Sequence, residues 1–233
     1  MNKLFVIAGL ILASATVQAS DFFTLADQFF SKHVHEGKVA YSTIKSDQAE
    51  LNALLESIAA FDLKGANSVT QKAFMINAYN VLAIKGIINK YPVKSPMKVS
   101  NFFDNKIFIV AGKKMSLNQL EKEKLYPMTK DPRLHFVLVC AAVSCPKLAS
   151  FAYKPETLEH QLEEVTKKTL NDPDFIRMKG SKVELSEIFN WYSGDFKTKG
   201  KSTLDYINQY RTEKFPSSSK VSFYTYNWTL NDK

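Results

Sequence analysis

The chain has 233 residues, of which 45% are hydrophobic and 12% aromatic, and its formal net charge is +8. This composition is sufficient for a buried core and excludes general disorder. Lysine supplies nearly all of the positive excess without forming a dominant block, whereas recognition of phosphates and bases favours arginine. Nucleic acid is therefore not an expected partner.

The first residues have the three parts of a secretory signal peptide. Lys3 gives the positive start, residues 4–13 form an apolar run, and Val17 and Ala19 suit cleavage after Ala19. The run is about half of the roughly 20 residues that a membrane-spanning helix needs. We therefore expect a signal peptide over 1–19, a single globular domain over 20–233, and a periplasmic or secreted product. We expect this product to be a monomer without a membrane anchor.

Helical periodicity dominates the first part of the mature chain. It predicts helices over 21–33 and 48–60, with an extended or turn-like segment over 38–46. Ser68 or Thr70 can cap a long helix that ends before the Tyr91-Pro92 pair.

The second part mixes helical and extended patterns. A short β-branched run predicts a strand over 106–111 with a turn at Gly112, and Ser116 opens a helix. Residues 133–140 (RLHFVLVC) are the clearest strand candidate in the chain. The remaining expected elements are a helix over 157–170, a strand edge over 182–185, a mixed segment over 186–196, a helix over 204–210 and a strand over 221–228. This order predicts an α+β fold in which helices pack on a small antiparallel sheet.

The segment 131–146 (DPRLHFVLVCAAVSCP) holds the residues best suited to chemistry. In a strand, His135 and Cys140 would point to opposite faces, while Cys145 lies beyond the strand and can fold back toward His135. Pro146 suits the first position of a short helix, and a helix N-terminus at Cys145 would stabilise its thiolate.

Two interpretations of the cysteines remain open. Cysteine catalysis needs a nucleophile, a base and an orienting group, which predicts Cys145, His135 and one of Glu121, Asp131 or Asn77. However, the two cysteines lie five residues apart in an exported chain, and such a pair is commonly a disulfide that closes a small loop.

Other polar groups favour ordinary structural roles. His33 and His35 have no cysteine or carboxylate cluster at ligand spacing, and His160 lies on a helix among glutamates, so no metal and no cofactor is expected. Asn77 and Asn80 lie in a helix that should be apolar inside, so their amides need partners, and Asn77 can brace a loop near the site.

Four blocks of the sequence resemble the signature blocks of the domain-of-unknown-function 547 family. They are KAFMINAYNVLAI (72–84), DPRLHFVLVCAAVSCPKL (131–148), LSEIFNWYSGDF (185–196) and YNWTLND (226–232). Two positions differ from the usual pattern of the family: Met75 stands where tryptophan is common, and Ala141 stands where glycine is common. We expect Ala141 to stiffen the turn after the predicted strand.

The resemblance implies a papain-like α+β fold of rearranged order, in which the acid and the histidine precede the cysteine. On that pattern His135 matches the histidine, Cys145 the cysteine and Glu121 the acid. The family was named for its lack of a known function, so peptidase, transferase and non-catalytic roles all stay open.

Two functional hypotheses follow. In the first, the domain is a thiol-dependent hydrolase or acyltransferase that acts on an envelope peptide or amide, with an oxyanion held by backbone N–H groups near Ser144 and Cys145. In the second, it is a non-catalytic envelope module that binds a peptide or polymer. Cys140 and Cys145 then form a disulfide, and a groove is lined by aromatic side chains: Trp191, Tyr192, Tyr226 and Trp228.

Overall fold

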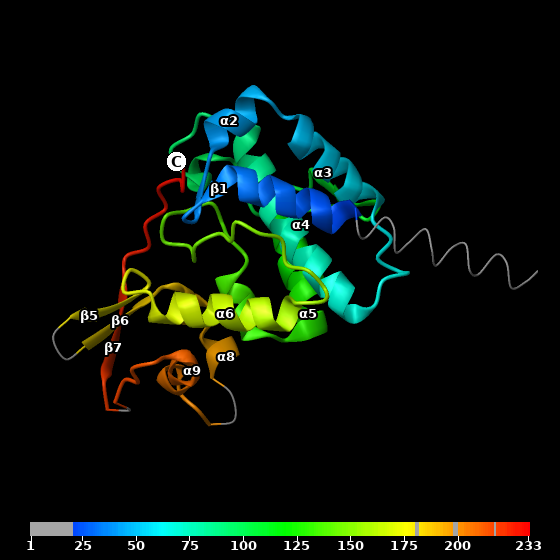
Figure 1. Ribbon diagram of the computed structural model, residues 1–233. Helices are drawn as coiled ribbons and strands as arrows, with labels where there is room; N and C mark the ends of the chain where they lie inside the picture. The colour runs from blue at the N-terminus through cyan, green and yellow to red at the C-terminus, as the bar shows by residue number, and fades with distance from the viewer. Residues whose placement is uncertain (1–20, 180–181, 198–199, 217) are drawn as a thin grey trace, which may run out of the picture.

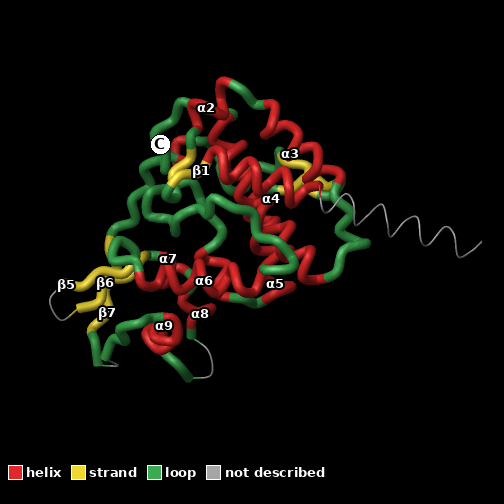
Figure 2. The backbone as a smooth tube through the Cα atoms, in the orientation of Figure 1, coloured by secondary structure: helices red, strands yellow, loops and turns green. Residues whose placement is uncertain are grey.

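The computed structural model describes residues 21–179, 182–197, 200–216 and 218–233 (Figures 1 and 2). The expected signal peptide over 1–19 lies outside the described residues. Within them, no helix is long and apolar enough to cross a membrane.

Helices are the main regular elements of the fold. A helix over 21–33 is followed by α2 (Tyr41–Ser46), α3 (Ala49–Ala60) and α4 (Ser68–Ile88). After several short turns, α5 (Tyr126–Thr129), α6 (Leu158–Asn171), α7 (Ile188–Trp191), α8 (Ser193–Phe196) and α9 (Thr203–Tyr210) complete the set. The short turns include two 3-10 helices, η1 (Pro96–Lys98) and η3 (Pro132–Phe136), and a π-helix, η2 (Gln119–Leu125).

The strands form three small sheets. Two are antiparallel pairs, β1 (Val34–His35) with β2 (Lys38–Val39) and β3 (Phe108–Val110) with β4 (Lys113–Met115). The third contains β5 (Ile176–Lys179), β6 (Lys182–Ser186) and β7 (Lys220–Tyr224) in that order. In it, β5 and β6 are antiparallel, whereas β6 and β7 are parallel. The expected α+β class is therefore confirmed, with one parallel pair in place of a wholly antiparallel sheet.

Helix α4 runs through the centre of the molecule, with α2, α3 and the helix over 21–33 on one side and α6 on the other (Figure 1). It is buried along most of its length because its side chains are apolar nearly all round. Phe74 stacks on Phe61 with ring centroids 3.8 Å apart and also contacts Phe22 from the first helix. The helix starts as predicted, but Asn67 caps it by accepting a hydrogen bond from Thr70 N, not Ser68 or Thr70.

The predicted strand over 133–140 is wrong. Residues 132–136 form η3, because Pro132 fits its first turn and the Asp131 carboxylate accepts a hydrogen bond from Arg133 N. After η3, Val137 forms a turn and residues 138–140 belong to no helix or strand. Instead, the Asn80 side chain donates to Val137 O and accepts from Val139 N, both at 2.9 Å. A buried amide thus satisfies the backbone groups that a sheet would otherwise satisfy.

Two other predictions require correction. Residues 41–46, expected to be extended or turn-like, form α2. The late strand is shorter than 221–228, because β7 ends at Tyr224 and the chain continues as an irregular segment to the C-terminus. The predicted helices over 48–60, 157–170 and 204–210 are confirmed to within one residue at their ends. Helix α9 begins where it does because of a capping box, in which the side chains of Ser202 and Asp205 accept hydrogen bonds from each other's backbone N–H groups.

Candidate functional site

A cavity of about 260 Å³ brings together the three predicted site residues, Glu121, His135 and Cys145. Glu121 comes from η2, His135 from η3 and Cys145 from the loop after η3. Four aromatic side chains from the C-terminal third also line it, as predicted: Trp191, Tyr192, Tyr226 and Trp228. Residues spread over most of the chain thus meet at one place.

Cys140 and Cys145 form a disulfide. The pairing that the sequence left open is therefore present in the structure. His135 and Cys140 both line the cavity, so they do not point apart as the predicted strand required.

The sulfur of Cys145 accepts two hydrogen bonds. One comes from the backbone N–H of Cys140 at 3.1 Å and the other from the hydroxyl of Tyr226 at 3.2 Å. The Tyr226 oxygen also lies 3.3 Å from the Cys140 sulfur. Because charged acceptors gain most from such donors, this arrangement favours a negative charge on Cys145 once the disulfide is reduced. The expected short helix at Cys145 is absent, since residues 141–150 form turns and irregular chain.

The backbone N–H groups predicted to bind an oxyanion are already used. Ser144 N donates to Asn227 O at 3.2 Å and Cys145 N donates to Ala142 O at 3.1 Å. The first bond holds the loop against the C-terminal segment, and the second closes a turn within the loop. The two N–H groups are therefore not free to stabilise a developing charge in this state.

His135 pairs with Asp195, a residue that the sequence analysis missed. Nε2 of His135 lies 2.8 Å from Oδ2 of Asp195, and the imidazole packs on the ring of Tyr192 with centroids 4.1 Å apart. Burial lowers the pKa of His135, while the hydrogen bond and charge of Asp195 act in the opposite direction. A neutral imidazole next to this carboxylate carries its proton on Nε2, which leaves Nδ1 as the basic nitrogen.

Glu121 lies in the same cavity but has other partners. Its carboxyl group hydrogen-bonds the hydroxyls of Tyr79 and Tyr192, and burial raises its pKa. The orienting contact predicted for Glu121 is thus made by Asp195, while Glu121 is a buried acid that retains its proton more readily than usual.

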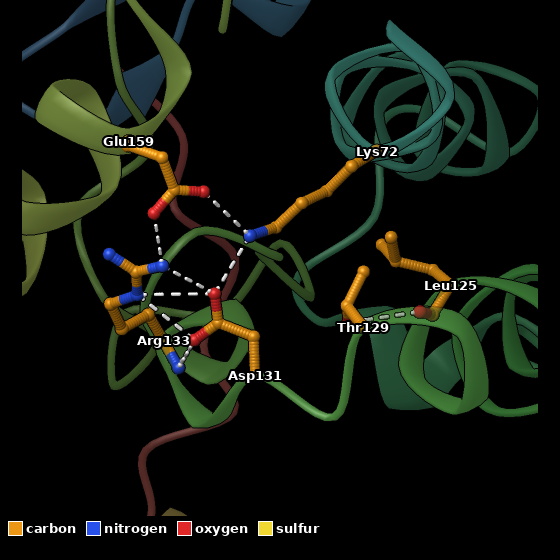
Figure 3. A network of polar contacts seen from close by, with 6 residues as sticks. All are labelled: Lys72, Leu125, Thr129, Asp131, Arg133 and Glu159. Carbon is orange, nitrogen blue, oxygen red and sulfur yellow. Dashed lines mark hydrogen bonds and ion pairs between the residues drawn. The ribbon is translucent and has the colours of Figure 1, made fainter. Parts of the chain in front are cut away.

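The other two candidate orienting groups serve the fold. Asn77 braces Tyr153 by accepting from its backbone N–H and donating to its carbonyl oxygen. Asp131 lies in a network of ion pairs that joins α4, η3 and α6 (Figure 3).

In that network Asp131 accepts hydrogen bonds from Lys72 at 2.8 Å and from Arg133 at 2.7 Å, and both cations also reach Glu159. Burial alone would raise the pKa of Asp131, but its bonds to Arg133 and Lys72 outweigh this and lower it to about 2. The network therefore fixes the start of η3, two residues before His135.

Asp195 could not be found from spacing, because 60 residues separate it from His135. The only signal is a carboxylate in the aromatic segment 189–196 (FNWYSGDF), where a charge needs a partner. Among the described residues, no group of histidine, cysteine and acidic side chains is arranged to hold a metal ion.

The fold and the cavity define a helix-rich α+β domain with a disulfide, a histidine–carboxylate pair and a buried acid in one aromatic pocket. Residues 63–170 match the family described as "Protein of unknown function, DUF547", so this segment is similar to that family. The match includes Glu121, His135 and Cys145 and ends before Asp195 and Tyr226. No curated protein and no solved structure matches the chain.

Proposed function

We propose that the domain is a thiol-dependent hydrolase or acyltransferase whose nucleophile is Cys145 in the reduced state. The observation that carries the proposal is the pair of hydrogen bonds to the Cys145 sulfur, inside a cavity that also holds the His135–Asp195 pair. A purely structural disulfide needs neither a hydroxyl that donates to its sulfur nor a buried imidazole that lines the same cavity.

The reaction begins with the reduction of the disulfide. An external dithiol supplies two electrons and two protons, so Cys140 and Cys145 become thiols and the donor becomes a disulfide. His135 then takes the proton of Cys145. The thiolate attacks a carbonyl carbon, a thioester forms, and the leaving amine receives the proton from the imidazolium. Water or another nucleophile cleaves the thioester and restores the thiol.

Glu121 takes a different role from the one expected. Glu121 lines the same cavity as Cys145, and burial raises the pKa of its carboxyl group, so whenever this group is protonated it is a donor for the developing oxyanion. This compensates for the backbone N–H groups of Ser144 and Cys145, which are engaged elsewhere.

We propose that the domain works outside the cytoplasm, in the periplasm or after secretion, on an envelope peptide or amide. The signal-like residues 1–19 and the disulfide support this location, since disulfides persist in oxidising compartments. Fractionation of cells that express the full chain, followed by measurement of its intact mass, tests this part. Uncleaved protein in the cytoplasm would contradict it.

Acyl transfer to Cys145 tests the chemistry. The Cys140→Ser variant leaves Cys145 free without added reductant and should acquire one acetyl group at Cys145 from p-nitrophenyl acetate, as mapped by peptide mass spectrometry. In the same background, His135→Ala should slow this reaction by about 100-fold, and Cys145→Ala should abolish it. Acetylation no faster than that of an unfolded cysteine peptide would overturn the proposal.

A second candidate function is favoured by the aromatic wall. Trp191 is 49% exposed and stacks on Trp228 with centroids 5.9 Å apart, which suits binding of a planar or apolar group without catalysis. In that case the disulfide only holds the pocket in shape. A Cys145→Ala variant that retains all activity of the parent in cells would favour this function over the first.

A further inference from the structure

A second cavity, of about 650 Å³, lies on the other side of Cys145. Cys145 and Pro146 line both cavities, so this dipeptide forms a wall between them. The second cavity is bounded by the loop over 142–151, by one end of α6 and by the sheet that contains β5 and β7. A molecule that reaches Cys145 can therefore extend in two directions.

The two cavities differ in chemistry. The first has an aromatic wall, whereas charged side chains of both signs line the second. Within the second, Lys147 is paired with Asp172 at 2.7 Å. Lys168 and Arg177 line it without a carboxylate partner among the residues that the structure describes.

Arg177 is held in a definite position. Its guanidinium carbon lies 3.9 Å from the centroid of the Tyr224 ring, and its Nε donates to the backbone oxygen of Asp174 at 3.2 Å. The two terminal nitrogens donate to no protein acceptor within the described ranges. A planar guanidinium that is fixed on one face, with its terminal nitrogens unpaired, matches the two oxygens of a carboxylate.

We propose that the second cavity is a subsite for a carboxylate group of the ligand, with Arg177 as its anchor and Lys168 as a second cation. The ligand is then an extended peptide that crosses the wall formed by Cys145 and Pro146, with an apolar part in the aromatic pocket. The evidence for the carboxylate subsite comes from the second cavity alone. The path of the peptide from one cavity to the other past Cys145, called the crossing below, rests on the proposed function.

Binding to the oxidised protein tests the subsite without thiol chemistry. N-acetylated tetra-alanine with a free C-terminal carboxylate should shift the NMR signal of the Arg177 Nε–H group, and the same peptide with a C-terminal amide should not. Arg177→Gln should weaken binding of the carboxylate peptide by about tenfold or more, because a bidentate charged contact is lost. Lys179→Gln, which removes a nearby cation that pairs with Glu184, should leave binding unchanged. Equal shifts with both peptides, or no shift with either, would overturn the subsite.

Labelling of the Cys140→Ser variant tests the crossing, because in the reduced parent the Cys140 thiol would release the peptide by forming the Cys140–Cys145 disulfide again. The two peptides are extended at the N-terminus by a mercaptoacetyl group in a mixed disulfide with pyridine-2-thiol. The Cys145 thiolate attacks the peptide sulfur, a new disulfide forms, and pyridine-2-thiolate leaves. The carboxylate peptide should react faster than the amide peptide, and Arg177→Gln should remove the difference. Binding without any preference in labelling would overturn the crossing alone. Failure of both peptides to label Cys145 faster than an unfolded cysteine peptide would refute the proposed function and the crossing, with the subsite intact.

Discussion

Oδ2 of Asp195 lies 2.8 Å from Nε2 of His135, so a residue of α8 fixes the imidazole of η3. The contact determines which ring nitrogen is the base, because the nitrogen beside the carboxylate keeps the proton. Asp195 therefore orients the His135 imidazole, the role that the resemblance to the family implied for Glu121.

Asp195→Asn should lower the pKa of His135, since the charge and hydrogen bond of Asp195 raise it against the effect of burial. The NMR titration of the imidazole measures this shift. Acylation of Cys145 in the Cys140→Ser background should also slow by about 100-fold, because an oriented base is lost. Asp205→Asn serves as the control, since Asp205 caps α9 by bonding Ser202 and does not contact His135. Equal effects of the two substitutions would contradict the pairing.

Tyr226→Phe should raise the pKa of the Cys145 thiol in the reduced protein by about one unit, because a hydrogen bond to a charged acceptor is worth about 1.5 kcal/mol or more. The pH dependence of the rate at which iodoacetamide alkylates Cys145 gives this value. Tyr224→Phe is the matched control, as the Tyr224 hydroxyl donates to Phe175 O and touches neither sulfur. An unchanged thiol pKa in Tyr226→Phe would remove the main support for Cys145 as a thiolate.

The sequence predicted the elements that depend on local patterns, such as α3, α6 and α9, and identified Glu121, His135 and Cys145, which meet in one cavity. It failed where tertiary contacts override the pattern. The apolar run over 133–140 reads as a strand, but the side chain of Asn80 satisfies its backbone, and no local signal reveals that partner. Asp195 was missed for the same reason, because only the folded chain brings it to His135.

Asp131→Asn should destabilise the protein by about 3 kcal/mol at pH 7, since the buried Lys72 and the half-buried Arg133 keep only the exposed carboxylate of Glu159. The folded pKa of Asp131, about 2, lies below its usual 3.8. The Asp131 charge therefore adds about 2 kcal/mol to the free energy of unfolding above pH 3.8. This contribution is lost as the pH falls through about 2.

Urea unfolding at pH 7 and near pH 2 measures this difference for the parent and the variant. Glu159→Gln is the control, because its side chain is 67% exposed and its ion pairs should contribute less than about 1 kcal/mol. A loss of stability in Asp131→Asn that is the same at both pH values would show that the network does not depend on the Asp131 charge.

Ala141→Gly should stabilise the loop between the two cysteines. Ala141 has φ of +62°, a conformation that favours glycine, and glycine is common at this position in the family that the sequence resembles. Release of this strain should raise the free energy of unfolding by about 1 kcal/mol. Ala142→Gly is the control, since Ala142 is not among the residues with positive φ and should lose stability instead. Thermal unfolding measures the stability of both variants relative to the parent. A lower stability of Ala141→Gly would contradict the expectation.

The central claim, that Cys145 is a stabilised nucleophile behind a reducible disulfide, is tested most directly by comparing alkylation of the two cysteines. Folded protein is treated with a substoichiometric electrophile before and after reduction, and the labelled peptides are quantified by mass spectrometry at neutral pH. We predict no labelling before reduction. After reduction, we predict labelling of Cys145 at least about tenfold faster than of Cys140, because two donors stabilise the Cys145 sulfur. Equal labelling of Cys140 and Cys145, at the rate of unfolded cysteine peptides, would contradict the claim.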